Sequence, residues 1–122
     1  MSLKELLIRI IDALKVDYVV EEGTSGIWTY RKWNSGIAEC WGTYSNTISA
    51  STTSNGNYIN YPFTFTQVPC ITLGLVAGGA NLYKGHIEQG ATSTTQVRLT
   101  LINEYTGAVV IKMNMHIIGR WK

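Results

Sequence analysis

The pattern of the chain from Val16 to the C-terminus constrains the fold more than any other feature. Short segments rich in Thr, Val, Ile, Tyr and Trp alternate there with turn signals built from Gly, Asn and Ser. β-branched and aromatic residues favour strands, and many short strands joined by such turns are typical of an antiparallel β-sandwich or barrel. The expected strands are Tyr18–Glu21, Ile27–Trp33, Ile37–Tyr44, Ile59–Thr66, Cys70–Ala77, Tyr83–Gln89, Thr94–Asn103 and Val109–Arg120.

The N-terminus has the pattern of an amphipathic helix. Ser2 can act as the N-cap, and Glu5, three residues later, completes a capping box. Apolar residues then recur at spacings of four, three and four, which is the a/d pattern of a coiled-coil seam. The seam residues are Leu3, Leu7, Ile10 and Leu14.

These two patterns divide the chain into an N-terminal amphipathic helix over residues 1–16 and a β-sandwich domain over residues 17–122. The helix either lies on its own domain or forms the end of a parallel coiled coil that joins identical chains. We favour the coiled coil, because the rest of the chain offers no other helix to pack on. A seam this short is marginal alone, so the following domain must also associate. Leucine at a with isoleucine at one d position leans towards more than two strands.

Composition argues against several classes of function. The net charge is only +2 and no Lys/Arg cluster occurs, so we expect no binding to nucleic acid. No segment reaches the roughly 18 apolar residues of a membrane span, and charges interrupt the first helix, so neither membrane insertion nor a signal peptide is expected. Only 15% of the residues are charged, as expected if association hides part of the surface or if the surface is rich in Ser, Thr and Asn. Cys40 and Cys70 lack metal-site spacing and leave open a disulfide or two free thiols.

The tripeptide NSG that ends at Gly36 predicts a hairpin turn with this glycine in the left-handed region. The turn sets a register in which Arg31 lies opposite Glu39 as a cross-strand charge pair. In the same register Trp28 covers Gly42, where a ring compensates for the missing side chain of a strand glycine.

Both faces of this hairpin are apolar. A hairpin with one face exposed to water would need only one apolar face. This hairpin therefore lies between two layers, or one face contacts another subunit. One face carries Ile27, Trp33, Ile37 and Trp41, and the other carries Trp28, Tyr30, Ala38 and Cys40.

Three motifs resemble the C-terminal domains of tail-fibre and minor structural proteins of bacteriophages and prophages, especially those of Gram-positive hosts. The first and most specific is EGTSGIWTYRKWNSGIAECWGTY, from Glu22 to Tyr44. The others are YPFTFTQVPCITL, from Tyr61 to Leu73, and the terminal IIGRWK, from Ile117 to Lys122. The resemblance implies a β-sandwich knob at the end of a tail appendage, usually a homotrimer headed by a coiled coil. It leaves open whether the chain is a fragment of a longer fibre protein or a separate tail subunit.

Catalytic patterns are missing from the sequence, so we expect no enzyme activity, no metal and no cofactor. A nucleophilic triad needs a positioned histidine, and neither His86 nor His116 lies in a recognisable motif. A glycosidase needs two carboxylates that flank a cleft, and only Glu88 and Glu104 have no other expected role.

Aromatic residues near predicted turns are the candidates for ligand binding, because sugars dock their apolar faces on rings and hydrogen bond to polar groups at the edge. Each ring has the commoner alternative of a core or interface role. The preferred candidates are Tyr58, Tyr83 and Tyr105, with Asn57 and Asn81 as polar partners. The wider set adds Tyr44, Tyr61, Trp121, Asn60 and Asn103. The polar segment Ser45–Asn57 is either a solvated loop or edge strand, or a ligand-contacting loop.

Three functions follow from these features. The preferred one is a trimeric knob of a phage tail appendage that binds host cell-surface saccharide through loops or grooves between subunits. The alternative is a purely structural module that trimerises and caps the appendage, and the least favoured is a polysaccharide-degrading enzyme. The expected partners are further copies of the chain, other tail proteins and the saccharide. The expected location is the virion tail, after synthesis in the bacterial cytoplasm.

Overall fold

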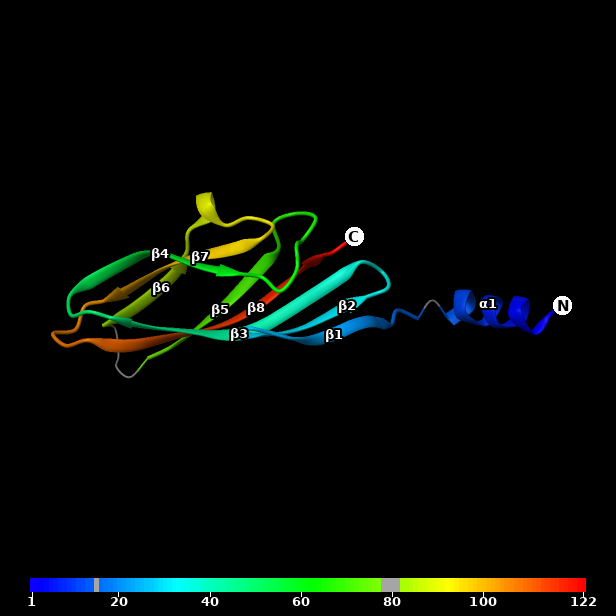
Figure 1. Ribbon diagram of the computed structural model, residues 1–122, viewed down its shortest axis with the longest axis horizontal. Coiled ribbons are helices and arrows are strands. Elements are labelled where there is room, and N and C mark those ends of the chain that lie inside the picture. The colour runs from blue at the N-terminus through cyan, green and yellow to red at the C-terminus, as the bar shows by residue number, and fades with distance from the viewer. Residues whose placement is uncertain (15, 78–81) are drawn as a thin grey trace.

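The computed structural model describes residues 1–14, 16–77 and 82–122. Figure 1 shows a helix, α1, that extends away from a body built of two β-sheets. The sheets face each other with the hydrophobic core between them, so the fold is the predicted antiparallel β-sandwich. Within the described ranges, no helix is long and apolar enough to cross a membrane.

The helix α1 (Leu3–Leu14) begins with the predicted capping box. The amide of Ser2 donates a hydrogen bond to Oε2 of Glu5 (3.0 Å), and the amide of Glu5 donates one to Oγ of Ser2 (3.1 Å). The first turn is therefore fixed by local contacts alone, as the sequence pattern indicates.

The seam of α1 is exposed to solvent rather than packed on the sandwich. Leu3 is 82% exposed, Leu7 56% and Ile10 47%, while the side chain of Leu14 lies outside the described part of the chain. A helix of this length is marginal in water without a packing partner. The seam is thus available for association, and the coiled coil stays a prediction.

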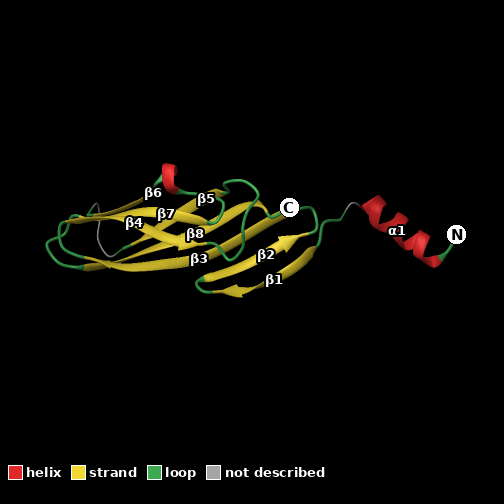
Figure 2. Cartoon of the chain, turned by 45° about the horizontal axis from the view of Figure 1, so that its top comes forward, coloured by secondary structure: helices red, strands yellow, loops and turns green. Residues whose placement is uncertain are grey.

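The larger sheet has five strands in the order β1-β2-β3-β8-β5, each antiparallel to its neighbours. Figure 2 shows β1 and β2 as a hairpin at one edge of this sheet. Its strands are β1 (Val19–Ser25), β2 (Trp28–Trp33), β3 (Ile37–Ile48), β5 (Cys70–Val76) and β8 (Val109–Arg120).

The smaller sheet has three antiparallel strands in the order β4-β7-β6. Its strands are β4 (Thr52–Asn60), β6 (Tyr83–Ile87) and β7 (Gln96–Asn103), and the short 3₁₀ turn η1 (Gln89–Ala91) follows β6. Alternate residues of β7 and β8 point inward and build the core between the sheets. These buried residues are Val97, Leu99 and Leu101 from β7, with Ile111, Met113, Met115 and Ile117 from β8.

The predicted hairpin register is confirmed. Trp28 lies opposite Gly42 and Arg31 lies opposite Glu39, and Gly36 in the turn has a φ of +101°. Glycine is required at position 42, because a Cβ there would lie 2.3 Å from the carbonyl oxygen of Ile27. The close approach of β2 to β3 thus depends on this glycine.

The predicted charge pair across the hairpin is wrong, although the two residues are opposite each other. Arg31 instead pairs with Glu22 of β1, with 3.2 Å between Nε and Oε2. Glu39 pairs with His116 of β8, with 2.8 Å between Oε2 and Nε2. The strand of each residue has a second neighbour, β1 beside β2 and β8 beside β3, and the hairpin sequence alone does not reveal these neighbours.

Two segments differ from the expected strands. The segment after Asn60 leaves the sheet at Pro62, which has no amide hydrogen for a ladder, and crosses the end of the sandwich, where Tyr61 and Phe65 are buried. The alternating rings therefore cap the core rather than extend a strand. The polar segment Ser45–Asn57 is mostly strand, since it contains the end of β3 and most of β4, which is an edge strand.

The outer face of the large sheet is unusually apolar for a surface. Ile27 is 42% exposed, Ile37 39% and Ile118 41%, and the half-buried rings of Trp33 and Trp41 lie among them. The opposite face of the hairpin is buried in the core. Packing within the chain therefore explains the apolar inner face of the hairpin, but it does not explain the apolar outer face.

The two cysteines are not bonded to each other. Cys40 is buried in the core and Cys70 is exposed, and both are free thiols. Burial raises the pKa of the Cys40 thiol to about 12, so this group stays protonated near neutral pH.

Candidate ligand-binding groove

A groove of about 420 Å³ lies between the edge strand β4 and the β1–β2 turn. Its volume is within the roughly 300–1,000 Å³ that is typical of small-ligand sites. The two sheets contribute opposite walls, so the groove exists only in the assembled sandwich. Its principal lining residues are Ser25, Ile27, Tyr44, Tyr58, Asn60 and Tyr61.

A contact between the sheets fixes the inner end of the groove. The indole Nε1 of Trp28 donates a hydrogen bond to the carbonyl oxygen of Asn60 (2.6 Å). The ring of Tyr61 meets Trp28 edge-on, with 6.3 Å between the ring centroids, and meets Phe65 in the same manner at 5.2 Å. The hydroxyl of Tyr61 is buried and has no hydrogen-bond partner among the described residues, and burial raises its pKa. Tyr61 thus acts mainly as an apolar wall.

A β-bulge in β4 aims the residues at the rim of the groove. The pairing of β4 with β7 shifts between Ser54 and Asn57, and Gly56 within this interval has a φ of +71°, which favours glycine. After the bulge, Asn57 points into the core while Tyr58, the next residue, points outward and is 51% exposed.

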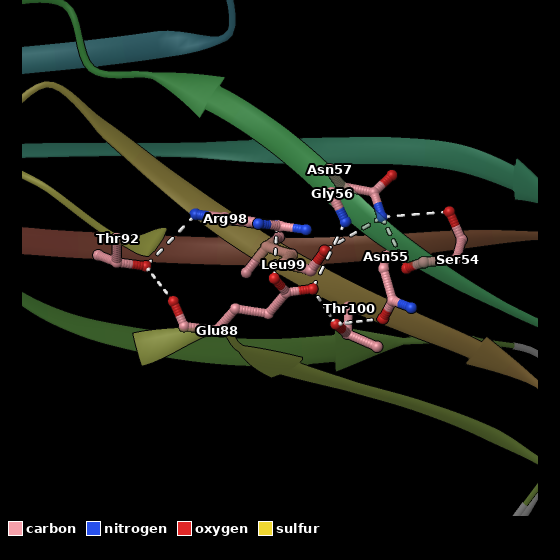
Figure 3. A network of polar contacts seen from close by, with 9 residues as sticks. All are labelled: Ser54, Asn55, Gly56, Asn57, Glu88, Thr92, Arg98, Leu99 and Thr100. Carbon is pink, nitrogen blue, oxygen red and sulfur yellow. Dashed lines mark hydrogen bonds and ion pairs between the residues drawn. The ribbon is translucent and has the colours of Figure 1, made fainter. Parts of the chain in front are cut away.

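The side-chain amide of Asn57 holds the bulge from inside. Its Oδ1 accepts hydrogen bonds from the hydroxyl of Tyr44 (3.0 Å) and from Nδ2 of Asn46 (2.9 Å). Its Nδ2 donates to the carbonyl oxygens of Ser54 (3.0 Å) and Leu99 (3.1 Å), the contacts drawn in Figure 3. A buried amide satisfied on both sides specifies one conformation of the strand around it.

A second polar network lies on the outer face of the small sheet (Figure 3). Nε of Arg98 lies 2.5 Å from Oε2 of Glu88, although its N–H is not aligned with that oxygen, so the contact is an ion pair rather than a directed hydrogen bond. Oε1 of Glu88 accepts hydrogen bonds from the hydroxyl of Thr100 and from the amide of Gly56 (3.4 Å). The guanidinium carbon of Arg98 lies 4.9 Å from the ring centre of Tyr58.

This network stabilises the ionised form of Glu88. The hydrogen bond from Thr100 lowers the pKa of the Glu88 carboxyl, and the Gly56 amide and the Arg98 charge add to the effect against a smaller opposing effect of burial. The carboxylate therefore remains charged at neutral pH.

The structure separates the predicted ligand residues into two groups. Tyr58 and Tyr105 are on the surface, 51% and 46% exposed, and only Tyr58 lines the groove. Asn57 and Tyr83 are buried, 6% and 9% exposed, and contribute to the framework. Asn81 lies outside the described residues. Ligand binding by these residues stays a prediction.

From the wider candidate set, the fold brings Tyr44, Tyr61 and Asn60 together with Tyr58 in the groove. Arg98 and Glu88 were not expected to contact this site. Their relation to Tyr58 depends on the register of β4 with β7, in which Tyr58 lies opposite Arg98. That register follows a bulge at Gly56, and a glycine between two asparagines indicates a turn or a bulge without showing which strand will pair there.

The groove is suited to an uncharged ligand with both apolar and hydroxyl-bearing faces. Aromatic and aliphatic side chains form its walls, Ser25 and Asn60 supply polar groups, and no charged side chain is among its described lining residues. Within the described ranges, no group of three His, Cys, Asp or Glu residues is placed to hold a metal ion. Among the described residues that line the groove, no pair of carboxylates faces across it.

Comparisons by sequence find no relative: no protein-family model matches the chain, and no curated protein does. Comparison of structures finds pyocin fibres. An R1 pyocin fibre from P. aeruginosa matches with a TM-score of 0.67 and 12% identity over 89% of this chain, which spans 30% of that fibre chain. An N-truncated R1-type pyocin tail fibre matches with a TM-score of 0.67 and 11% identity over 92% of this chain and 94% of its own.

An R2 pyocin fibre from P. aeruginosa matches less closely, with a TM-score of 0.52 and 15% identity over 90% of this chain and 28% of its own. At these identities the similarity establishes a shared fold. The expectation of a Gram-positive host gains no support from these structures. The chain has the fold found in C-terminal parts of pyocin tail fibres.

Proposed function

We propose that this chain is the terminal domain of a phage-type tail fibre, located in the tail of the particle, that binds host cell-surface saccharide. The observation that carries the proposal is the structural match to an R1-type pyocin tail fibre, which covers 94% of that fibre chain and 92% of this one. The three sequence motifs that resemble phage tail proteins support it independently.

We further propose that the chain acts as a homotrimer joined by α1 and by the outer face of the large sheet. The exposed seam residues Leu3 and Leu7 support this, as do the exposed isoleucines of that face. Together they leave apolar surface that a stable monomer would normally bury. Other tail proteins are the remaining expected partners, and neither nucleic acid nor a membrane is among them.

Light scattering tests the assembly. We expect a mass three times that of the 13.5 kDa chain, and we expect Leu7→Asp in the seam to lower it. Ile8→Asp is the matched control, because Ile8 is similarly exposed at 48% but lies outside the seam. A monomeric wild-type protein would contradict the proposal.

Binding of the assembled protein to host cells and to an array of bacterial surface polysaccharides tests the ligand. We expect binding that Tyr58→Ala abolishes and that Tyr105→Ala, a surface tyrosine outside the groove, leaves unchanged. A trimer that binds no cell and no polysaccharide would favour the alternative function, a structural module that trimerises and caps the appendage. The exposed seam of α1 is the observation that favours this alternative.

A binding role is favoured over catalysis. The enzyme hypothesis would require cleavage of a surface polysaccharide that is lost in Glu88→Gln. The ion pair of Glu88 with Arg98 and its hydrogen bond from Thr100 instead assign this carboxylate to the framework.

A further inference from the structure

We propose that Arg98 is a positioning residue for ligand binding: it holds the ring of Tyr58 at the rim of the groove in the orientation that stacks on a sugar. This inference rests on the proposed saccharide-binding function. It adds a role for a residue that does not itself line the groove.

The first observation is the position of Arg98 beneath the ring. Tyr58 of β4 and Arg98 of β7 are direct cross-strand partners on the outer face of the small sheet. The guanidinium carbon lies 4.9 Å from the ring centre, within the distance of a cation–π contact. Because Tyr58 is 51% exposed, the guanidinium covers part of the ring and leaves the rest free for a ligand.

The second observation is that Arg98 is itself held in place. Its Nε lies 2.5 Å from the carboxylate of Glu88, and the two side chains are only 28% and 20% exposed. Glu88 is fixed in turn by the hydroxyl of Thr100 and by the backbone amide of Gly56, two residues before Tyr58. Backbone and side-chain groups of β4 and β7 thus hold the Glu88 carboxylate (Figure 3), and this carboxylate in turn holds the guanidinium of Arg98.

The third observation is the contrast with the other ion pair of the small sheet. Lys84 and Glu104 also link β6 to the end of β7, at 3.0 Å, but their side chains are 56% and 47% exposed. Exposed pairs of this kind contribute little, since water screens them. The Glu88–Arg98 pair is less exposed, and its guanidinium contacts the Tyr58 ring that lines the groove. An ion pair that served stability alone would not need this contact.

Ordering the ring before the ligand arrives removes an entropy cost from binding. Immobilising one side chain on binding accounts for roughly a threefold to tenfold change in affinity. Arginine suits this task better than lysine, because its planar guanidinium stacks on a ring and contacts a carboxylate at the same time.

The experiment compares Arg98→Met, Arg98→Lys and Glu88→Gln with Lys84→Met as the matched control, in the assembled protein. One measurement is affinity for the surface polysaccharide that wild type binds best on the array. The other is NMR of protein with isotope-labelled tyrosine rings, recorded without ligand, which reports the ordering of the Tyr58 ring. We expect Arg98→Met to bind roughly three to ten times more weakly, Arg98→Lys to resemble it, and Lys84→Met to resemble wild type.

In the NMR spectra we expect the Tyr58 ring signals of Arg98→Met and Glu88→Gln to move towards those of a freely rotating ring. The signals of Tyr44 and Tyr61 should stay in place. Unchanged Tyr58 signals in folded Arg98→Met would overturn the inference, and so would unchanged affinity. If Arg98→Met does not fold, Glu88→Gln decides by the same readouts.

The two proposals fail in different ways. If wild type binds no polysaccharide but Arg98→Met still disorders the Tyr58 ring, the proposed function is refuted, and only the ordering of the ring by Arg98 is supported. If Tyr58→Ala abolishes binding but Arg98→Met leaves it intact, the positioning role of Arg98 is refuted and the proposed function is supported.

Discussion

The outer faces of the two sheets differ in kind. On the large sheet, exposed isoleucines and half-buried tryptophans surround separate polar contacts, such as the hydrogen bond between Glu39 and His116. On the small sheet, polar side chains join into one network that runs from Glu88 through Arg98 to Tyr58. Apolar surface left uncovered favours association, whereas an ordered polar and aromatic surface favours selective contact with a polar ligand. This difference is the basis of our proposal that the large-sheet face serves assembly and the small-sheet face serves recognition.

The first prediction tests the apolar face and carries the largest expected effect. The double substitution Ile37→Lys with Ile118→Lys places two charges on the outer face of the large sheet, and we expect the trimer to dissociate while the sandwich stays folded. Ile102→Lys is the matched control on the outer face of the small sheet, opposite Lys84 and Thr53. Light scattering and circular dichroism measure both outcomes. Loss of assembly in the control alone would reverse the assignment of the faces.

The second prediction compares the buried amide of Asn57, which holds the bulge of β4, with an exposed amide on the large sheet. Asn57→Ala removes a buried side chain and leaves the Tyr44 hydroxyl and the Leu99 carbonyl without their partner, so we expect a loss of about 2 kcal/mol in the free energy of unfolding. Asn114→Ala breaks only an exposed hydrogen bond with Thr43 on the large sheet, and the expected loss is below about 0.5 kcal/mol. Urea denaturation measures both. Equal losses would show that the buried hydrogen bonds of Asn57 add no specific stability.

The third prediction uses pH and has the smallest expected effect. The folded pKa of Glu88 is lowered from its ordinary value of 4.5, so its contribution to stability is present above pH 4.5 and is lost as the pH falls through the lower folded pKa. Glu88→Gln removes this dependence, and its stability should vary less with pH in that acidic range. Thermal melting from pH 6 downward measures the difference. Identical pH profiles for the variant and wild type would contradict the proposed coupling.

Asp17, next to the larger sheet, gives an internal reference for that measurement. Ser35 in the β2–β3 turn donates hydrogen bonds to Asp17, which precedes β1, and these bonds lower the pKa of the Asp17 carboxyl, the bond from the Ser35 hydroxyl most. Asp17→Asn should therefore flatten the same acidic range without altering the Tyr58 ring signals. The pair of variants separates a local turn contact from the network beside the groove.

The sequence by itself determined the features that depend on near neighbours. The capping box of Ser2 and Glu5, the all-β character and the register around Gly36 need only spacing, propensity and turn chemistry, and the structure contains them. The same local signals identified Tyr58 as a candidate, because it follows a polar turn-like segment.

Only the tertiary structure decided the features that depend on which strands become neighbours. Arg31 and Glu39 lie opposite each other as expected, yet β1 supplies the ion-pair partner of Arg31 and β8 supplies the hydrogen-bond partner of Glu39. The segment after Asn60 alternates like a strand, yet Pro62 and the open end of the sandwich direct its rings over the core. The groove and the contact of Arg98 with Tyr58 arise where two sheets and a bulge meet. Long-range pairing sets such contacts, and no local pattern encodes that pairing.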